Sequence, residues 1–228
     1  MPIIDDDEFG RITIRRSGNS RAMRATVAPN GTLRVSVPAY APIFMVKRMI
    51  QSSRSDLRKL FSSRPSIVLS NGMSVGKSHT LLARSGSSFN LQTKGLQLIV
   101  TLGPDQSLDD RSVIESVREQ MRKLLRKEAK AHLPRRIAYL AQSYGYEFTS
   151  LRFTHASSRW GSCNSKRAIS LNIALMNLPF ELIDYVLLHE LAHTKHLNHS
   201  KEFWDEVAKT DTHFRAHRTQ LMQYNPDI

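Results

Sequence analysis

One short motif constrains this chain more than any other, the run His189-Glu190-Leu191-Ala192-His193. The residues around it are apolar on almost every side, which predicts a buried helix. Positions i and i+4 of a helix lie one turn apart on one face, so the two imidazoles can converge on a single cation. Buried histidines and a buried glutamate are costly without a partner, and a metal ion supplies one. The motif therefore predicts a metal-binding helix; the alternative is two buried histidines with local hydrogen bonds.

A third metal ligand has to come from the residues that follow. A catalytic zinc takes three protein ligands and keeps one position open. His196 lies on the same face of a continuous helix but about 10 Å further along it, at ~1.5 Å per residue, too far for zinc bonds of about 2 Å. His199 reaches the metal only if the chain folds back after about residue 196, and Asn198 readily takes the left-handed conformation for such a bend. We therefore predict that His189, His193 and His199 bind Zn²⁺, with His196 as the alternative third ligand.

The residues beside these histidines indicate hydrolytic chemistry. Bound zinc lowers the pKa of its water to about 7, and a neighbouring carboxylate takes the proton as the water attacks a carbonyl. Glu190 fits this general-base role, because it follows a ligand in sequence yet points off the line of ligands. In the loop 158–164, Arg159 can stabilise an oxyanion or hold a substrate carboxylate or phosphate; alternatively it packs over Trp160 in a core. Cys163 as a fourth ligand would close the site.

Composition excludes several classes of protein. With 40% hydrophobic and 23% charged residues, the chain is typical of a soluble globular protein. No apolar run is long enough to span a bilayer, and the N-terminal residues MPIIDDDEFG are acidic where a signal peptide is basic. The single cysteine excludes an internal disulfide and fits a reducing compartment. We expect a cytoplasmic location and no membrane contact.

The net charge of +13 is large for 228 residues and favours acidic partners. The basic excess is spread over residues 11–24, 47–64 and 111–136, with few aromatic residues between them. No nucleic-acid-binding module is recognisable. This pattern is typical of a basic, solvated surface, and contact with nucleotides or nucleic acid is the alternative.

The first half of the chain predicts a β-rich unit. Asn30-Gly31, between alternating residues, is a strong hairpin signal. Apolar residues at helical spacing predict an amphipathic helix over residues 42–61 that covers one face of a sheet. The predicted strands are residues 11–16, 22–28, 33–37, 79–84, 89–92 and 96–102.

The second half predicts a mixed α+β domain. A helix is expected from about Asp109 to His132, and a second from Pro134 to Tyr144, ended by Gly145. Strands at residues 147–154 and 168–172 then form a small antiparallel sheet that precedes the metal-binding helix. The predicted fold class is α+β, with a β-rich N-terminal domain at residues 1–105 and a catalytic domain at residues 106–228.

Several longer runs carry a resemblance to a known family. They are RAMRATVAPNGTLRVSVP at residues 21–38, RWGSC at 159–163, ISLN at 169–172 and YVLLHELAHTKHLNHSKEFW at 185–204. With these runs the chain resembles the YgjP-like zinc metallopeptidase family, within the small zincins that also include the SprT-like proteins. The resemblance implies zinc ligands at His189, His193 and His199, a catalytic base at Glu190, and a zincin-like catalytic domain behind a β-rich part.

Three functions are compatible with these patterns. The leading hypothesis is a zinc-dependent peptidase in which the strand at residues 168–172 is an open edge that pairs with an extended peptide. The second is a metal-dependent hydrolase of nucleotides or other phosphate esters, favoured by the basic surface and Arg159. The third is a binding module in which zinc is structural and its removal unfolds the domain.

Overall fold

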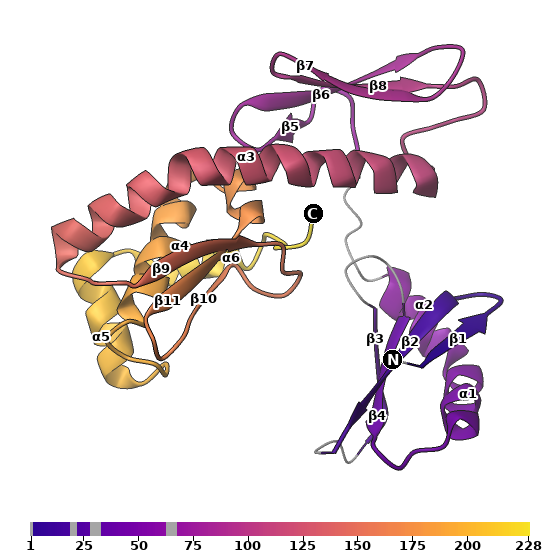
Figure 1. Cartoon of the computed structure of the whole chain (residues 1–228), viewed down its shortest axis with the longest axis horizontal. Coiled ribbons are helices and arrows are strands. Elements are labelled where there is room, and N and C mark those ends of the chain that lie inside the picture. The colour runs from indigo at the N-terminus through magenta and orange to yellow at the C-terminus, as the bar shows by residue number, and fades with distance from the viewer. Residues whose placement is uncertain (1, 19–21, 28–32, 63–67) are drawn as a thin grey trace. The chain divides into compact units, whose positions relative to one another are not determined.

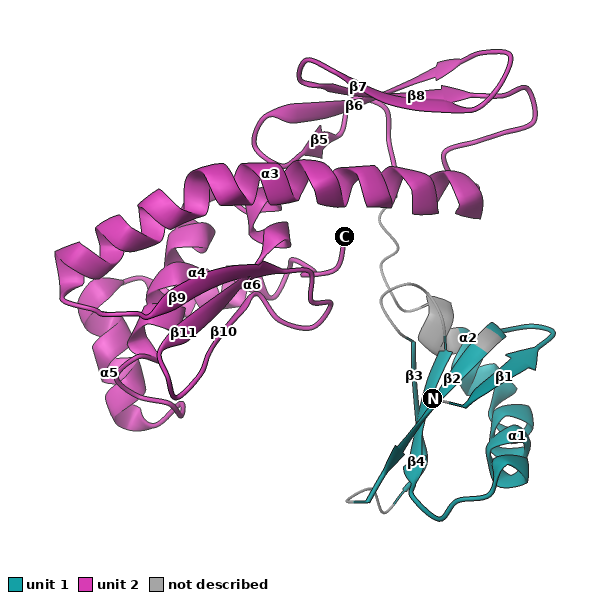
Figure 2. Cartoon of the chain, viewed as in Figure 1, with its two compact units in different colours: residues 1–67 teal, residues 68–228 magenta. Residues whose placement is uncertain are grey.

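A computed structural model describes residues 2–18, 22–27, 33–62 and 68–228 of the chain. The chain divides into two compact units, residues 1–67 and residues 68–228 (Figure 2). Each unit has its own core and is described by itself. No helix among the described residues is both long and apolar enough to cross a membrane.

The first unit is a four-stranded sheet with two helices. The strand order is β1-β2-β4-β3, in which β2 and β4 run parallel and the outer pairs are antiparallel (Figure 1). The predicted helix over residues 42–61 is interrupted at Ser53 and forms two helices. The predicted turn at residues 29–32 lies outside the described residues. The elements are β1 (Ile3–Asp6), β2 (Gly10–Ser17), β3 (Arg24–Val27), β4 (Leu33–Pro38), α1 (Ile43–Ser52) and α2 (Arg54–Ser62).

Alternation along the strands explains why this unit forms. Ile12 and Ile14 on β2, like Leu33 and Val35 on β4, are fully buried, while the residues between them are more exposed. Val46 and Ile50, one turn apart on α1, belong to the same core cluster. The predicted amphipathic helix therefore covers the apolar face of the sheet, as its periodicity indicated.

The second unit begins with another four-stranded sheet, in the order β5-β6-β8-β7. Its strands are β5 (Ser74–Val75), β6 (His79–Ser85), β7 (Asn90–Lys94) and β8 (Gln97–Leu102). Figure 1 shows this sheet beside α3, and Glu128 of α3 accepts hydrogen bonds from the backbone N–H groups of Lys77 (2.7 Å) and Ser78 (3.1 Å). These bonds explain why the sheet is in the same compact unit as the helix, although the sequence suggested a division after residue 105.

A single long helix, α3 (Arg111–Tyr144), spans the second unit. The sequence predicted two helices separated before Pro134, and this was wrong. Leu133 and Ile137 on either side of the proline are fully buried. Their packing keeps the helix continuous although the proline cannot donate a backbone hydrogen bond. Gly145 ends the helix in the left-handed conformation, with φ 68°, as predicted.

The rest of the second unit is a small sheet with three helices. The strand order is β10-β11-β9, with β11 parallel to β9 and antiparallel to β10. The sheet is therefore mixed rather than antiparallel as predicted, while the α+β class is confirmed. The elements are β9 (Ser150–Thr154), β10 (Gly161–Cys163), β11 (Ala168–Asn172), the 3-10 helix η1 (Ile173–Asn177), α4 (Phe180–Ala192), α5 (Lys201–Thr210) and α6 (Phe214–Leu221).

Candidate metal centre

The helix that carries the H-E-x-x-H motif is α4, and it ends earlier than the sequence suggested. Its last residue is Ala192, whose carbonyl accepts backbone hydrogen bonds from Lys195 (3.1 Å) and His196 (3.0 Å). These bonds close the helix without a left-handed residue: among the described non-glycine residues only Arg167 has a positive φ. The prediction that Asn198 makes the bend in this conformation was therefore wrong, although the chain does fold back before α5.

The fold-back brings three imidazoles together, those of His189, His193 and His199. Each offers one ring nitrogen, and these nitrogens all lie within 4.8 Å of one another. The Nε2 atoms of His189 and His199 are 3.1 Å apart. Tetrahedral zinc with bonds of about 2.0–2.1 Å places two ligand nitrogens roughly 3.3 Å apart. The spacing therefore fits a zinc ion, and His196, the alternative ligand, is not in this cluster.

His196 contributes its backbone instead of its ring. Nδ1 of His193 is 2.9 Å from the His196 carbonyl oxygen. A carbonyl only accepts, so the Nδ1–H of His193 donates and its Nε2 keeps a free lone pair. Burial lowers the pKa of His193, and burial with the two neighbouring imidazoles lowers the pKa of His189 to about 3. Both rings are thus neutral, which is the form that binds a metal.

Two aromatic residues of α5 support the imidazoles. The ring of Phe203, fully buried, lies 4.9 Å from that of His189, 4.4 Å from that of His193 and 4.8 Å from that of His199, between centroids. Trp204 stacks on His199 at 5.6 Å and 21°. The sequence analysis missed both residues, although they follow the last histidine directly in the run HSKEFW. Their helical spacing after His199 was the available signal.

Glu190 lies beside the histidines in a confined position. The residue is 5% exposed, and burial raises the pKa of its carboxyl group to about 8, against the opposing charge of Arg159. Its Oε2 atom is buried and has no hydrogen-bond partner among the described residues. A Cβ atom on Gly161 would lie 2.6 Å from Oε1 of Glu190, so only glycine leaves room for this carboxylate at the start of β10.

A buried asparagine fixes the loop that carries Arg159 and Trp160. The Nδ2 group of Asn172 lies within hydrogen-bond distance of the carbonyl oxygens of Ala156, Arg159 (3.0 Å) and Pro226 (3.1 Å), which share its two N–H donors, and its backbone N–H donates to the Trp160 carbonyl at 2.8 Å. Asn172 is fully buried. The sequence analysis noted it only as part of a strand, because nothing local indicates a side chain that joins three segments.

Arg159, predicted as a catalytic residue, lines the same cavity as His189 and Glu190. Its guanidinium group forms no ion pair within the part of the chain that the structure describes. Cys163, the possible fourth ligand, is outside the histidine cluster, and burial raises the pKa of its thiol to about 11. Asp184, which precedes Glu190 on α4, accepts a hydrogen bond from Nε of Arg136 at 2.7 Å.

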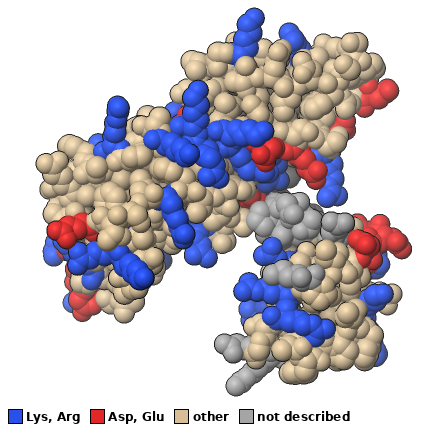
Figure 3. All heavy atoms as spheres, in the orientation of Figure 1, with Lys and Arg blue, Asp and Glu red and all other residues tan. Residues whose placement is uncertain are grey.

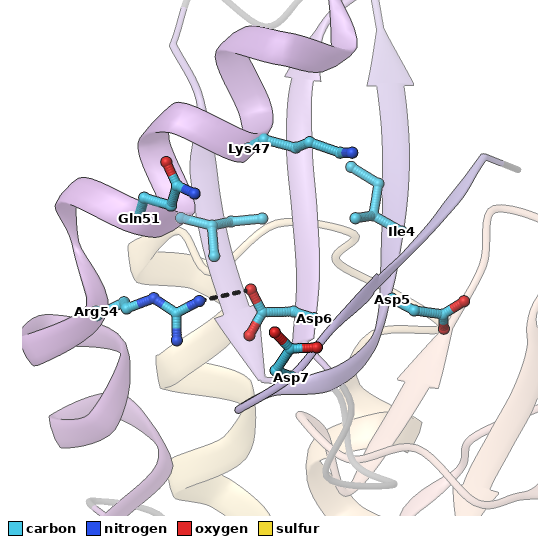
Figure 4. A pocket seen from close by; sticks show the side chains of 8 residues that line it. Ile4, Asp5, Asp6, Asp7, Lys47, Gln51 and Arg54 are labelled. Atoms are coloured by element: carbon cyan, nitrogen blue, oxygen red, sulfur yellow. Dashed lines mark hydrogen bonds and ion pairs between the residues drawn. The ribbon is translucent and has the colours of Figure 1, made fainter.

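The first unit holds a separate cavity of about 190 Å³ between β1 and the helices. Figure 4 shows Arg54 pointing into it toward Asp6, with which it forms an ion pair at 3.0 Å. Arg54 also binds Glu8 at 2.6 Å. Asp6 and Glu8 thus have a basic partner, and no described side chain of this unit has a buried polar atom without a partner as Glu190 does.

Comparisons with known proteins match the chain to a family and to a solved structure. Residues 21–224 match the family described as the YgjP-like, metallopeptidase domain. No curated protein matches the sequence. The chain is similar to a solved structure, the crystal structure of the metallopeptidase zymogen of Pyrococcus abyssi abylysin, with 28% identity and a TM-score of 0.35, over 38% of this chain and 89% of that chain.

The family match covers most of the chain, and it defines the protein as a metallopeptidase, a hydrolase that uses a metal ion. More particularly, the chain belongs to the YgjP-like family, which confirms the resemblance seen in the sequence.

Proposed function

We propose that the protein is a zinc-dependent peptidase in which His189, His193 and His199 hold the ion and Glu190 is the general base. One observation carries this proposal: three imidazoles converge beside a buried carboxylate whose Oε2 atom has no partner among the described residues. An imidazole-only ligand set suits zinc among the divalent metals. Three ligands leave one coordination position for the reacting groups.

Zinc, when bound, polarises the peptide carbonyl and acidifies the attacking water. Glu190 receives the proton of that water at its free carboxylate oxygen. Burial makes the Glu190 carboxylate a stronger base than an exposed one, so it can take this proton and then deliver it to the departing amine. The tight space beside Gly161 keeps the carboxylate in one orientation for both transfers.

Arg159 has a second role in this proposal. Its guanidinium lines the cavity with Glu190 and is not paired with any described carboxylate. It is therefore available to stabilise a developing oxyanion or to bind a substrate carboxylate. Asn172 is the positioning residue for this loop, because it binds the Arg159 carbonyl at 3.0 Å.

The edge available to a peptide is β10 rather than the strand at residues 168–172. That strand, β11, lies in the centre of the sheet between β10 and β9, so the prediction that it is an open edge was wrong. β10 (Gly161–Cys163) is the outer strand next to Glu190. An extended peptide added to β10 would pass beside the histidine cluster.

Nucleotides are the weaker alternative as substrates. Figure 3 shows basic side chains gathered over α3. Among the residues of α3, Lys123, Arg126, Lys127 and Lys130 are exposed. The cavity beside Glu190 has mainly apolar walls and a single arginine, a poor match for several phosphate charges. We expect the basic surface of α3 to bind acidic partners without catalysing a reaction on them. We also expect the protein to be located in the cytoplasm.

Metal dependence and substrate class can be tested together. The purified protein would be incubated with a quenched peptide library and a panel of nucleoside triphosphates, after chelation and after return of Zn²⁺. We expect peptide cleavage that chelation abolishes and zinc restores. Phosphate release without peptide cleavage, or peptide cleavage that survives chelation, would contradict the proposal.

A further inference from the structure

A cavity of about 210 Å³ opens directly beside the candidate metal centre. It is bounded by the loop that precedes β10, by α4 and by α6. Its polar lining residues are Arg159, His189 and Glu190. The remaining walls are mainly aromatic and aliphatic, from Trp160, Tyr185, Val186 and Leu221.

The size of the cavity suits one side chain. Pockets for complete small-molecule ligands have volumes of roughly 300–1,000 Å³, and this cavity is smaller. Tyr185 and Val186 are 4% and 3% exposed, so this wall is part of the core of the unit. Burial raises the pKa of the Tyr185 phenol to about 12, so this residue of the wall is uncharged at neutral pH.

The cavity also lies where a bound peptide would need it. Gly161, the first residue of β10, is part of its lining and touches Glu190. Side chains of an extended peptide point alternately to opposite faces. A peptide paired with β10, with its carbonyl at the histidine cluster, therefore directs a neighbouring side chain toward Trp160 and Leu221.

We propose that this cavity is the specificity pocket of the peptidase and receives one apolar side chain, of leucine to phenylalanine size, from the residue next to the scissile bond. The proposal rests on the proposed peptidase function and adds its substrate class. Burial of such a side chain excludes water from Glu190 and contributes binding energy that a glycine or aspartate at that position lacks.

The test uses quenched peptides that differ at one position only, which is glycine, alanine, leucine, phenylalanine or aspartate. With zinc-loaded full-length protein we expect kcat/KM for leucine or phenylalanine to exceed that for glycine or aspartate at least about tenfold. Leu221→Trp fills the cavity from a partly exposed position on α6 and should cancel this preference, with alanine becoming the best residue.

Met222→Trp is the matched control, because it adds the same ring to the next residue, which is 73% exposed. This variant should keep the wild-type preference. An identical ranking of peptides by wild type and Leu221→Trp, or a preference for aspartate, would overturn the pocket.

Peptide binding separates the failure of the pocket from the failure of the peptidase. Zinc-loaded Glu190→Gln would be titrated with the same peptides, and binding followed by the fluorescence of Trp160 after Trp204→Phe, since the chain has two tryptophans. Tighter binding of leucine and phenylalanine peptides without cleavage by wild type would keep the pocket and reject the peptidase. Cleavage of all the peptides at similar rates would support the peptidase and reject the pocket. The absence of both cleavage and selective binding would reject both.

Discussion

Two glutamates in the second unit are buried to a similar degree but have opposite surroundings. Glu190 on α4 is 5% exposed and Glu206 on α5 is 8% exposed. Glu206 binds Lys195 at 2.6 Å and Lys209 at 3.0 Å, and these bonds lower the pKa of its carboxyl group to about 2. Glu190 has an unpartnered Oε2 atom, and burial raises its pKa to about 8.

The difference separates a structural carboxylate from a reactive one. Pairing with two lysines offsets the cost of burying Glu206 and ties α5 to the turn after α4. No such partner offsets the cost of burying Glu190, and a carboxyl group with a pKa raised in this way is typical of an active site. Glu190 therefore should govern rate with little effect on stability, and Glu206 should govern stability with little effect on rate.

The largest expected effect is that of Glu190→Gln. The amide keeps the size of the side chain but cannot accept the proton of the attacking water, so kcat should fall about 10²–10⁴-fold. Zinc content, measured by elemental analysis, should stay at the wild-type value because no ligand is changed. Wild-type proteolysis by this variant would show that Glu190 is not the base.

Gly161→Ala tests whether the position of the Glu190 carboxylate matters for the rate, because it displaces this group without changing its chemistry. The new Cβ would meet Oε1 of Glu190 at 2.6 Å, and a shift of about 1 Å can cost ~10²-fold in rate. We expect kcat to fall about 10–100-fold with zinc retained. Gly18→Ala, where an added Cβ meets nothing within 4 Å, is the control. Equal activities of the two variants would mean that the carboxylate moves freely.

Trp204→Ala should weaken zinc binding about tenfold. Loss of a residue that orients a metal ligand typically weakens binding about 10–100-fold, and we expect the low end of this range. His199, the exposed member of the three proposed ligands, stacks on Trp204, which in turn stacks on Phe214 at 5.7 Å and lies 4.8 Å from the Arg218 guanidinium. The Kd for zinc would be measured by competition with a chromophoric chelator. Trp204→Phe keeps a stacking ring and should recover most of the affinity; an unchanged Kd in the alanine variant would exclude this role.

Glu206→Gln should have the smallest effect, a loss of about 1–2 kcal/mol in unfolding free energy, since both lysines are partly exposed. A carboxyl pKa lowered from 4.5 to about 2 stabilises the fold above pH 4.5 and loses that contribution as the pH falls toward 2. Urea unfolding between pH 2 and 7 should show a shallower acid slope in the variant. Glu147→Gln, whose side chain is 84% exposed, should keep the wild-type slope; equal slopes in all three proteins would contradict the role of Glu206.

The sequence was sufficient to predict those helices and strands that follow from a local pattern of residues. The apolar surroundings of His189 and His193 predicted a buried helix, and alternation predicted β2 and β4. Zinc-bond length favoured His199 over His196, and the structure brings His199, not His196, to the other two imidazoles. These predictions depend on helix and strand periodicity and on ligand geometry, which adjacent residues determine.

Contacts distant in sequence determined what could not be predicted. The parallel pairing of β11 with β9 and the support of three segments by Asn172 leave no periodic trace. The continuity of α3 through Pro134 depends on the burial of Leu133 and Ile137, which outweighs the local preference for a break. Helix α4 ends at Ala192 because of backbone hydrogen bonds in the following turn, and no residue there adopts the left-handed conformation.

Anomalous diffraction at the zinc absorption edge, from crystals of the zinc-loaded protein, tests the metal centre most directly. We expect one strong peak about 2 Å from a ring nitrogen of each of His189, His193 and His199, with Glu190 close by but not bonded to the ion. A peak that includes His196 or Cys163 in place of His199, or no peak at this cluster, would contradict the three-histidine centre.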